Sequence, residues 1–314
     1  MERRRLGASG VEVSRIIFGA GNFGGIGSAP ELFGQGTTEE QAFELLDAAW
    51  NLGITTLDTA DAYGGGRSET TIGKWIASRG HKPEITTKTF NPMEAGADHG
   101  LGRARVTRQL ESSLDRLGVD RVDAYLAHDF DLDTPLEEVV ETFDGLKQAG
   151  VIRAWGVSNF DSPQLRELFE LGRPSLVQNG YSLLQRSDEE DVIPLCADIN
   201  IAYVVHSPLS GGLLAGKYRR DQQPADNSRL ALRPGPYQHL LTDATFANIG
   251  EFVEAAIERG VTPATLAFAW VLAQPDVTAI VIGPSRVEHL GPPIEALDVR
   301  LTKDEADELA ALFD

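Results

Sequence analysis

Ionisable side chains stand at the ends of several short apolar runs along the chain. Asp58 ends "ITTLD", Lys88 ends "EITTK" and His128 follows "VDAYLA", while Tyr63 comes five residues after Asp58. Taken singly, each has a structural explanation, such as a turn aspartate or a tyrosine packed with its hydroxyl in water. A buried ammonium without a partner is costly, so Lys88 at the end of an apolar run indicates a nearby acceptor. Together the four residues indicate a site for proton chemistry.

The elements that must position these residues alternate regularly. Strand-type runs such as "ITTLDTA" and "EITTKTF" alternate with helical patterns such as "SETTIGKWIASRG", and we find eight such runs, from "RIIFGA" to "VTAIVIG". Strands that alternate with helices are typical of βαβ units and a parallel sheet. Eight units without a Pro-, Gly- or Ser-rich linker predict one α/β domain over residues 1–314, a (β/α)8 TIM barrel rather than a doubly wound sheet.

In such a barrel the C-terminal ends of all strands meet on one rim, where the chemistry lies. The other strand ends are also polar or glycine-rich. In chain order they are Gly21 and Asn22, Ser158 and Asn159, Gln178, His206 and Ser207, and Gly283. Packing does not explain polar residues at so many successive strand ends, so we expect a functional site on this rim.

Two further segments have a predicted role in the fold. The first ten residues, "MERRRLGASG", are expected to form a β-hairpin that caps the bottom of the barrel. Residues 208–244, after the seventh strand, form a connection with little pattern of its own, and such long connections are usually functional. We interpret this segment as a cofactor loop or lid; the alternative is a surface insertion.

The pattern Gly19-x-Gly21-x-x-Gly24 follows the first strand and resembles a dinucleotide-binding fingerprint. That fingerprint needs its third glycine at the start of a helix. Helical periodicity here begins only near Thr37, where Thr37-x-x-Glu40 predicts a capping box. The glycines are therefore interpreted as a loop and not as a Rossmann unit.

Composition narrows the class of protein. A net charge of −19 argues against binding to nucleic acid or to anionic membranes, which requires a surplus of Lys and Arg. An anionic ligand would need positive charge concentrated locally.

No apolar run approaches the roughly 20 residues of a membrane span. The single cysteine, Cys196, is expected in the core, and a cytoplasmic location is expected. The six histidines are scattered, so no metal site is predicted.

Several motifs resemble those of the aldo-keto reductase family, in particular its bacterial and potassium-channel β-subunit branches. They are "LDTADAYGGGRSE", "TTKTF", "LAHDFDLDTPLEE", "GVSNF", "LVQNGYSLL" and "HSPLSGGLLAGKY", and the resemblance covers nearly the whole chain. It implies that Asp58, Tyr63, Lys88 and His128 are the catalytic tetrad. The implied activity is the NADPH-dependent reduction of an aldehyde or ketone to an alcohol by hydride transfer, with a small-molecule carbonyl compound as substrate.

The tetrad suits that chemistry. Hydride transfer to a carbonyl leaves an alkoxide that a positioned acid must protonate, and Tyr63 would be this acid. A phenol is a weak acid at neutral pH, so the ammonium of Lys88 is needed to stabilise the phenolate, with Asp58 holding Lys88 in place. His128 would bind the substrate oxygen and orient the carbonyl.

The resemblance also implies a set of residues that bind NADP(H). Ser158, Asn159 and Gln178 correspond to the residues that hold the nicotinamide carboxamide, a role that hydroxyl and amide groups suit. The remaining expected residues are Gly21, Asn22 and Asp58; His206 at the position that stacks on the nicotinamide; Ser207, Leu209, Gly211 and Lys217 along the pyrophosphate; Gly283 and Ser285 at the adenosine phosphate; and Arg229 and Arg286 as readers of the 2′-phosphate.

Arg286 is expected near the start of the last helix, where backbone N–H groups also favour phosphate. The chain departs from the family pattern at three places, one of which, Ile282 in place of a residue that is often Pro-like before Gly283, is a neutral change. His206 replaces the aromatic ring that often stacks on the nicotinamide, and "EHLGPPIEAL" lacks the Glu-Asn pair that usually contacts adenine. Two alternatives stay open: an aldose or nucleotide-sugar oxidoreductase of secondary metabolism, and a cofactor-sensing regulatory protein of the channel β-subunit type.

Overall fold

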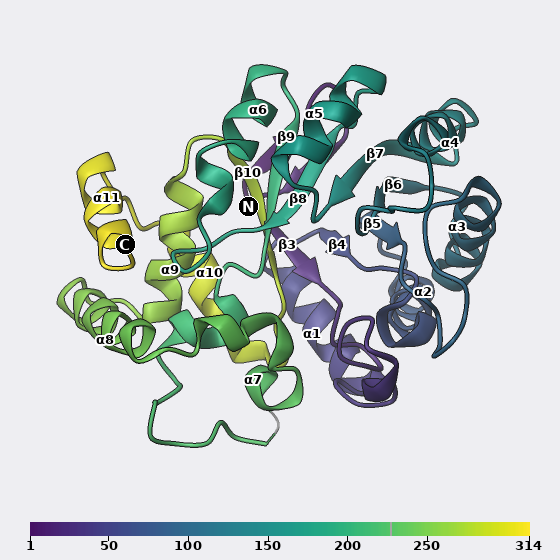
Figure 1. Cartoon of the computed structure of the whole chain (residues 1–314). Coiled ribbons are helices and arrows are strands. Elements are labelled where there is room, and N and C mark those ends of the chain that lie inside the picture. The colour runs from purple at the N-terminus through teal and green to yellow at the C-terminus, as the bar shows by residue number, and fades with distance from the viewer. Residues whose placement is uncertain (227) are drawn as a thin grey trace.

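The strands of the described chain close into a parallel barrel (Figure 1). The structure, a computed structural model, describes residues 1–226 and 228–314. Within these residues eight strands follow one another in the order β10-β3-β4-β5-β6-β7-β8-β9. They are β3 (Ile16–Gly19), β4 (Thr56–Asp58), β5 (Glu84–Thr89), β6 (Val122–Ala127), β7 (Ile152–Ser158), β8 (Leu176–Gly180), β9 (Ala202–His206) and β10 (Val277–Ile282). This confirms the predicted (β/α)8 barrel.

Helices surround the barrel as an outer layer (Figure 1). They are α1 (Glu39–Asn51), α2 (Arg67–Arg79), α3 (Arg103–Leu117), α4 (Leu136–Gln148), α5 (Ser162–Leu171), α6 (Val192–Asp198), α7 (Arg229–Leu232), α8 (Asp243–Glu258), α9 (Pro263–Ala273), α10 (Gly291–Ala296) and α11 (Lys303–Ala311). Their boundaries follow local sequence signals. Asp161, for example, accepts a hydrogen bond from the backbone of Gln164 at the start of α5, while the Gln164 side chain accepts one from the backbone of Asp161.

The capping box at the start of α1 lies one residue later than predicted. Thr38, not Thr37, caps the helix, and its partner is Gln41 rather than Glu40. The reason is tertiary. The backbone N–H of Thr37 donates to the carbonyl of Asn22 at 2.8 Å, and Thr37 forms an isolated parallel bridge with Phe23. This pairing holds Thr37 in an extended conformation outside the helix.

A short antiparallel hairpin closes the bottom of the barrel. It consists of β1 (Arg3–Arg5) and β2 (Glu12–Ser14), so it extends a few residues beyond the ten predicted for it. Leu6, Val11 and Val13 from this hairpin are buried in one cluster with inward-facing residues of the barrel strands, such as Leu126 and Val204. Burial of apolar side chains of this size stabilises a fold by roughly 1.5–3 kcal/mol each, so the hairpin is part of the core.

The loops at the opposite end of the barrel confirm that the glycines after β3 do not form a Rossmann unit. They also show how the segment 208–244 is built. After β3 the chain forms a 3-10 segment at Pro30–Leu32, and α1 begins only at Glu39, so Gly24 does not open a helix. The segment 208–244 includes α7 and two 3-10 segments, Ser210–Ala215 and Gly235–Leu240. Its apolar residues form a separate small cluster, which includes Leu213, Tyr218, Leu230 and Tyr237. Asn227, also within this segment, lies outside the described residues.

Cys196 is fully buried on α6, and burial raises the pKa of its thiol to about 12, as expected for a core residue. Over residues 1–226 and 228–314, none of the helices combines the length and the apolar character needed to cross a bilayer.

Candidate active site

Lys88 and Asp58 form a buried ion pair at the C-terminal ends of adjacent strands. The Nζ atom of Lys88 lies 2.5 Å from Oδ1 of Asp58 and donates to the carbonyl of Thr59 at 2.9 Å. Burial acts to lower the pKa of Lys88, but the nearby Asp58 and Tyr63 outweigh it and raise that pKa above its ordinary value. Lys88 is therefore an ammonium held in the barrel mouth.

Tyr63 lies between this ammonium and an imidazole. It begins the 3-10 segment Tyr63–Gly66 after β4, and its hydroxyl is 3.4 Å from Nε2 of His128. The Nζ atom of Lys88 is 5.2 Å from the centre of the Tyr63 ring. Burial, and then the positive charge of Lys88, hold the pKa of His128 well below its ordinary value. The phenol thus faces a cation on one side and a neutral imidazole on the other.

Asp58 is held at both of its oxygens. Its Oδ2 atom accepts a hydrogen bond of 2.8 Å from Nε2 of Gln178, which lies on β8, while its Oδ1 atom accepts from Lys88. Gln178 was expected only among the cofactor-binding residues. In this structure the Gln178 amide also orients the carboxylate that holds Lys88.

A second layer of buried polar groups connects the segments that carry Tyr63, Lys88 and His128. The sequence did not indicate this layer. Asp61 is fully buried; it accepts from the backbone of Ala62 and from the hydroxyl of Thr89, each at 2.6 Å. Its own backbone N–H donates to the carbonyl of Lys88 at 2.9 Å. Because it stands two residues before Tyr63, Asp61 ties the Tyr63 segment to the end of β5.

Arg105, on α3, extends this layer toward His128. Its guanidinium donates to the hydroxyl of Thr89 at 2.8 Å and to the carbonyl of Asn91 at 2.7 Å. The Asn91 amide in turn lies 3.4 Å from Nδ1 of His128. A sequence signal existed for Asp61, as the second acid of "LDTAD", but Arg105 lies on another element and no spacing pointed to it.

Asn159 and His206 form the opposite wall of the mouth. The Asn159 amide donates to the carbonyl of His128 at 2.8 Å, and its Oδ1 atom is 2.9 Å from Nε2 of His206. Nδ1 of His206 lies 3.1 Å from the hydroxyl of Ser207. Burial and then the charge of Lys88 lower the pKa of His206 to about 4, so this ring is neutral at neutral pH.

The backbone at this wall is unusual. Asn159 and Ser207 have φ angles of +62° and +55°, in the left-handed region that non-glycine residues seldom adopt. Such conformations persist only where the surroundings impose them, and they cluster at functional sites. Ser158, which precedes Asn159 at the end of β7, is almost fully buried.

The expected cofactor residues in the loops fall into separate groups. Gly21 packs beside Tyr63, since a Cβ there would lie 3.6 Å from the tyrosine ring. Asn22 accepts a hydrogen bond of 3.3 Å from Arg229, which joins the loop after β3 to α7. Leu209 packs against the main core, and the Nζ atom of Lys217 lies 5.1 Å from the centre of the Tyr218 ring.

Gly211 is required by two constraints. Its φ is +68°, and a Cβ at this position would come within 2.7 Å of the Tyr237 ring. A side chain at position 211 would therefore strain the backbone and displace the neighbouring segment. The Tyr237 ring therefore packs directly on the backbone of this loop at Gly211.

The third group follows β10. After Gly283, the backbone of Ser285 donates to Nδ1 of His289 at 3.3 Å, and the Arg286 guanidinium lies 3.2 Å from Nε2 of the same ring. The prediction that Arg286 stands near the start of the last helix is wrong. Arg286 precedes a 3-10 segment, Val287–Leu290, and both α10 and α11 follow it. The reason is that "GPP" restarts the helix at Gly291 with prolines in its first turn.

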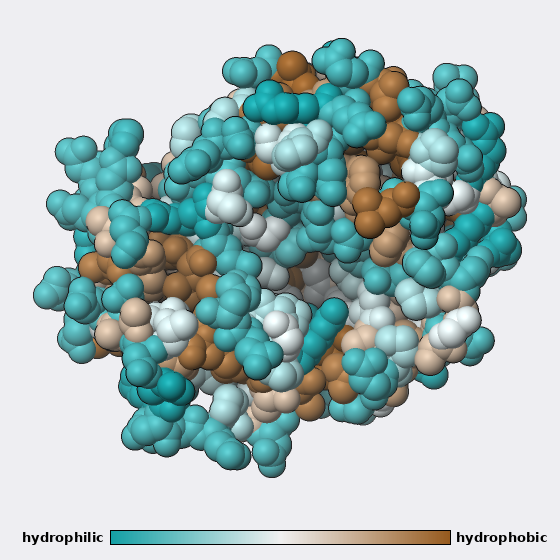
Figure 2. Space-filling view, viewed as in Figure 1, coloured by the Kyte–Doolittle hydropathy of each residue, from teal (hydrophilic) through white to brown (hydrophobic). Residues whose placement is uncertain are grey.

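These groups belong to one face of the molecule. Figure 2 shows that this face is hollowed near its centre and that hydrophilic residues make up much of the surrounding rim. The structure brings together Asp58, Tyr63, Lys88, His128, Asn159, Gln178, His206 and Ser207 through a continuous series of contacts. It does not join the Ser285–Arg286 group to them by a direct hydrogen bond among the described residues.

A parallel barrel with a lysine–carboxylate pair, a tyrosine and a histidine on its C-terminal rim places the chain among barrel proteins that carry an ionisable site at this end of the strands. The chain belongs to the aldo/keto reductase family, whose family model matches residues 15–314. It is therefore an oxidoreductase by family.

Individual relatives agree with this assignment. The chain is 35% identical over 322 residues to the uncharacterized oxidoreductase YrpG of Bacillus subtilis, covering 97% of this chain and 93% of the relative. It is 30% identical to a probable voltage-gated potassium channel subunit beta of Oryza sativa, covering 99% and 96% of the two chains. These relatives match the bacterial and channel-subunit branches expected from the sequence.

Solved structures show the same fold. A glycerol dehydrogenase from Gluconobacter oxydans superposes with a TM-score of 0.84 at 26% identity, covering 99% of this chain and 94% of that one. The holo form of an aldo-keto reductase from Bacillus halodurans superposes with a TM-score of 0.81 at 27% identity, covering 99% and 96%.

Proposed function

We propose that the protein is an NADPH-dependent reductase that converts an aldehyde or ketone to an alcohol, with Tyr63 as the general acid. The observation that carries this proposal is the position of the Tyr63 hydroxyl, 3.4 Å from Nε2 of His128 and beside the Lys88 ammonium. A nicotinamide cofactor, when bound, supplies the hydride that forms the new C–H bond. The proton that completes the alcohol comes from the Tyr63 hydroxyl.

His128 provides a second hydrogen-bond donor for the substrate oxygen. The Asn91 amide nitrogen is a donor and lies 3.4 Å from Nδ1 of His128, so Nδ1 is the acceptor and Nε2 carries the hydrogen in the neutral ring. Nε2 also lies 3.4 Å from the Tyr63 hydroxyl. The two groups therefore point donors at one place, where a carbonyl oxygen gains negative charge as the hydride arrives.

Lys88 and Asp58 prepare Tyr63 for this step. After the phenol gives up its proton, the ammonium of Lys88 stabilises the phenolate that remains. The ammonium stays charged because Asp58 lies 2.5 Å away, and Asp58 stays in place because Gln178 holds its other oxygen. Solvent returns the proton to Tyr63 before the next turnover.

The residues at the mouth fit a nicotinamide cofactor. Ser158, Asn159 and Gln178 present a hydroxyl and two amides, and these groups can both donate to and accept from a carboxamide. We assign the pyrophosphate to the loop after β9, which carries Ser207, Gly211 and Lys217. We assign the 2′-phosphate of NADPH to Arg286, supported by Ser285, with Arg229 near the loop after β3.

Loss of absorbance at the reduced nicotinamide band tests the proposal directly. We expect NADPH to be consumed with a panel of aldehydes, and consumption to stop in the Tyr63→Phe variant. No consumption with any aldehyde or ketone, although NADPH binds, would favour the alternative of a cofactor-sensing regulatory protein. Similarity to the channel subunit of Oryza sativa supports that alternative, and an intact set of acid–base contacts argues for turnover.

The similarity to a glycerol dehydrogenase also bears on the substrate. That enzyme is named for glycerol, a polyol. This name supports a hydroxylated carbonyl compound as the substrate of the present protein. Aldoses belong to this class, so the alternative of an aldose oxidoreductase stays open.

A further inference from the structure

Arg233 is a half-buried cation whose side chain has no hydrogen-bond or ion-pair partner among the residues that the structure describes. It follows α7, and its backbone N–H donates to the carbonyl of Arg229 at 2.9 Å. Taking a charged group partly out of water costs free energy, which a carboxylate or another acceptor normally offsets. The guanidinium of Arg233 is therefore placed to receive an anion.

This guanidinium lies against the glycine-rich loop after β3, close to the Tyr63 segment. A Cβ at Gly27 would overlap Nη1 of Arg233 and lie 3.6 Å from its Cζ atom. The carbonyl of Gly27 accepts a hydrogen bond of 3.1 Å from the backbone of Gly64, the residue after Tyr63. The backbone N–H of Gly27 donates at 2.6 Å to Gly21, which packs beside the Tyr63 ring. Arg233 thus borders the turn that holds the proposed acid.

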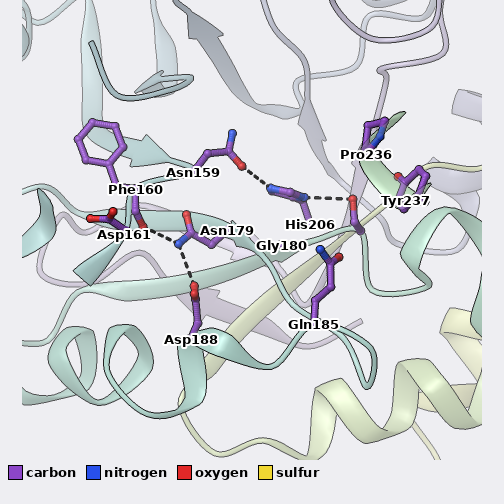
Figure 3. A pocket seen from close by; sticks show the side chains of 11 residues that line it. Asn159, Phe160, Asp161, Asn179, Gly180, Gln185, Asp188, His206, Pro236 and Tyr237 are labelled. Carbon is purple, nitrogen blue, oxygen red and sulfur yellow. Dashed lines mark hydrogen bonds between the residues drawn. The ribbon is translucent and has the colours of Figure 1, made fainter. Parts of the chain in front are cut away.

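The segment that carries Arg233 spans the barrel mouth. At one end, Arg229 donates to the side chain of Asn22 in the loop after β3. At the other end, Tyr237 lines a cavity of about 320 Å³ together with His206, on the opposite wall (Figure 3). Arg233 stands in the chain between these two attachments. It therefore lies at the mouth and not on the outer surface of the barrel.

The charge of Arg233 acts on the tetrad without a direct bond to it. Burial, and then the charge of Arg229, lower the pKa of Arg233, while Tyr63 acts in the opposite direction. Burial, and then the charge of Lys88, lower the pKa of His128, and the charge of Arg233 adds to this effect. Both ring residues that are proposed to meet the substrate oxygen thus lie within the electrostatic reach of Arg233.

The positive charge at this place contrasts with the net charge of −19 of the chain. Arg229 and Arg233 stand four residues apart, and like charges at this spacing repel each other. Glu31, an acid that acts on the pKa of Arg233, is exposed, and no ion pair joins the two among the described residues. Such a local concentration of positive charge attracts an anion. A guanidinium can bind a carboxylate or a phosphate through two parallel hydrogen bonds.

The cofactor and the substrate are the two sources of an anion at this mouth. The phosphates of the cofactor are assigned above to the loop after β9 and to Arg286. Arg233 lies instead beside the loop after β3, next to the turn that carries Tyr63. A substrate with its carbonyl oxygen at Tyr63 and His128 would bring the rest of its chain into this region. These contacts favour the substrate as the source of the anion.

We propose that Arg233 binds a carboxylate carried by the carbonyl substrate, a few atoms from the carbon that accepts the hydride. The inference rests on the proposed reductase function. It adds a specificity-determining residue that belongs neither to the tetrad nor to the expected cofactor set.

The first experiment compares 4-oxobutanoate with its methyl ester, which keeps the aldehyde and the carbon chain and removes the charge. Wild type should prefer the acid. In Arg233→Met we expect the ratio of kcat/KM for the acid to that for the ester to fall about 10–100-fold, mainly through KM, because a charged hydrogen bond is lost. Arg233→Lys keeps the charge and should retain part of the preference.

Arg219→Met is the matched control. It removes one positive charge from an exposed position of the same segment, 208–244, so it should leave the ratio unchanged. An unchanged ratio in Arg233→Met overturns the proposal. Equal losses for the acid and the ester also overturn it, because Arg233 would then act on the reaction and not on the carboxylate.

The second experiment separates the substrate from the cofactor as the source of the anion. In a fluorescence titration, Arg233→Met should bind NADPH as tightly as wild type does. A loss of NADPH affinity of tenfold or more would assign Arg233 to a phosphate of the cofactor and overturn the proposal.

The third experiment needs no turnover. Saturation-transfer NMR with 4-hydroxybutanoate, in the presence of NADP+, should show binding to wild type and to Arg219→Met and a clear loss of signal in Arg233→Met. Equal transfer in all three proteins overturns the proposal. If no aldehyde is reduced, the reductase function fails and the NMR signal still reports on Arg233. If aldehydes are reduced with the same ratio by wild type and Arg233→Met, only the carboxylate site fails.

Discussion

The carboxylate of Asp61 accepts a hydrogen bond of 2.6 Å from the hydroxyl of Thr89, and both residues are fully buried. Asp61 stands two residues before Tyr63, and Thr89 directly follows Lys88. The contact therefore couples the segment that carries the proposed acid to the strand that carries the ammonium. Arg105 reaches both partners, donating to Thr89 at 2.8 Å and lying 4.0 Å from Asp61.

The ionisation of Asp61 should influence stability. Burial, opposed by the hydrogen bond from Thr89, raises the pKa of Asp61 from 3.8 to about 7. The folded state thus holds a proton that the unfolded state has already lost. This contribution to stability is fully present below pH 4 and is lost as the pH rises through about 7. In Asp61→Asn the group cannot ionise, so the difference in unfolding free energy between variant and wild type should change by a few kcal/mol across this window.

Urea unfolding at several pH values between 4.5 and 8 measures this difference. Asp276→Asn, on the exposed turn before β10, is the matched control and should follow the wild-type profile. Parallel profiles for wild type and Asp61→Asn would show that Asp61 titrates as an ordinary carboxyl.

Tyr63→Phe tests the general acid. The substitution removes the proton donor and keeps the ring, so kcat should fall about 10²–10⁴-fold while the affinity for NADPH stays nearly constant. Tyr125→Phe is the control, because it also removes one hydroxyl, which donates to the carbonyl of Val106 in the core at 3.2 Å. Steady-state kinetics and a fluorescence titration of NADPH give both quantities. Turnover in Tyr63→Phe equal to that of Tyr125→Phe would exclude Tyr63 as the acid.

Lys88→Met should destabilise the protein as well as inactivate it. Removing the ammonium leaves Asp58 buried with Gln178 as its one side-chain hydrogen-bond donor among the described residues. Breaking a buried pair costs about 3–5 kcal/mol. The double variant Lys88→Met/Asp58→Asn removes the uncompensated charge, so it should recover much of the unfolding free energy and none of the activity. If stability is the same in the single and double variants, the pair does not couple as the geometry indicates.

Arg286→Ala tests the reading of the 2′-phosphate. We expect NADPH to bind more weakly by roughly 1.5–3 kcal/mol, as for a lost hydrogen bond to a charged group. NADH lacks this phosphate, so its affinity should change little. Paired fluorescence titrations measure both, with Arg259→Ala on the far end of α8 as the surface control. Equal losses for the two cofactors, or none, would assign the 2′-phosphate elsewhere, with Arg229 the next residue to test.

The segment 208–244 should become protected when the cofactor binds. Its apolar cluster and the hydrogen bond from Arg229 to Asn22 place it over the barrel mouth. If it closes on a pyrophosphate, hydrogen exchange and proteolysis in this segment should slow with NADPH present. Protection that is equal with and without NADPH would identify it as an insertion with no role in binding.

The sequence by itself determined the barrel and the tetrad's location. Eight alternating units define the fold class because strand and helix periodicity are local properties. Asp58, Lys88 and His128 end neighbouring strands, so closure of any parallel barrel brings them to one rim. The pairing of Lys88 with a carboxylate was likewise predictable, since a buried ammonium requires an acceptor.

Only the tertiary structure decided the contacts between elements that are distant in the chain. Thr38 rather than Thr37 caps α1 because the loop after β3 pairs with Thr37. Arg105 supports Thr89 and Asn91 because α3 packs beside β5. The amide nitrogen of Asn179 donates to Phe160 and Asp188, while its Oδ1 atom has no hydrogen-bond partner among the described residues. These relations depend on which side chains meet after the barrel closes, and residue type and spacing carry no information about that meeting.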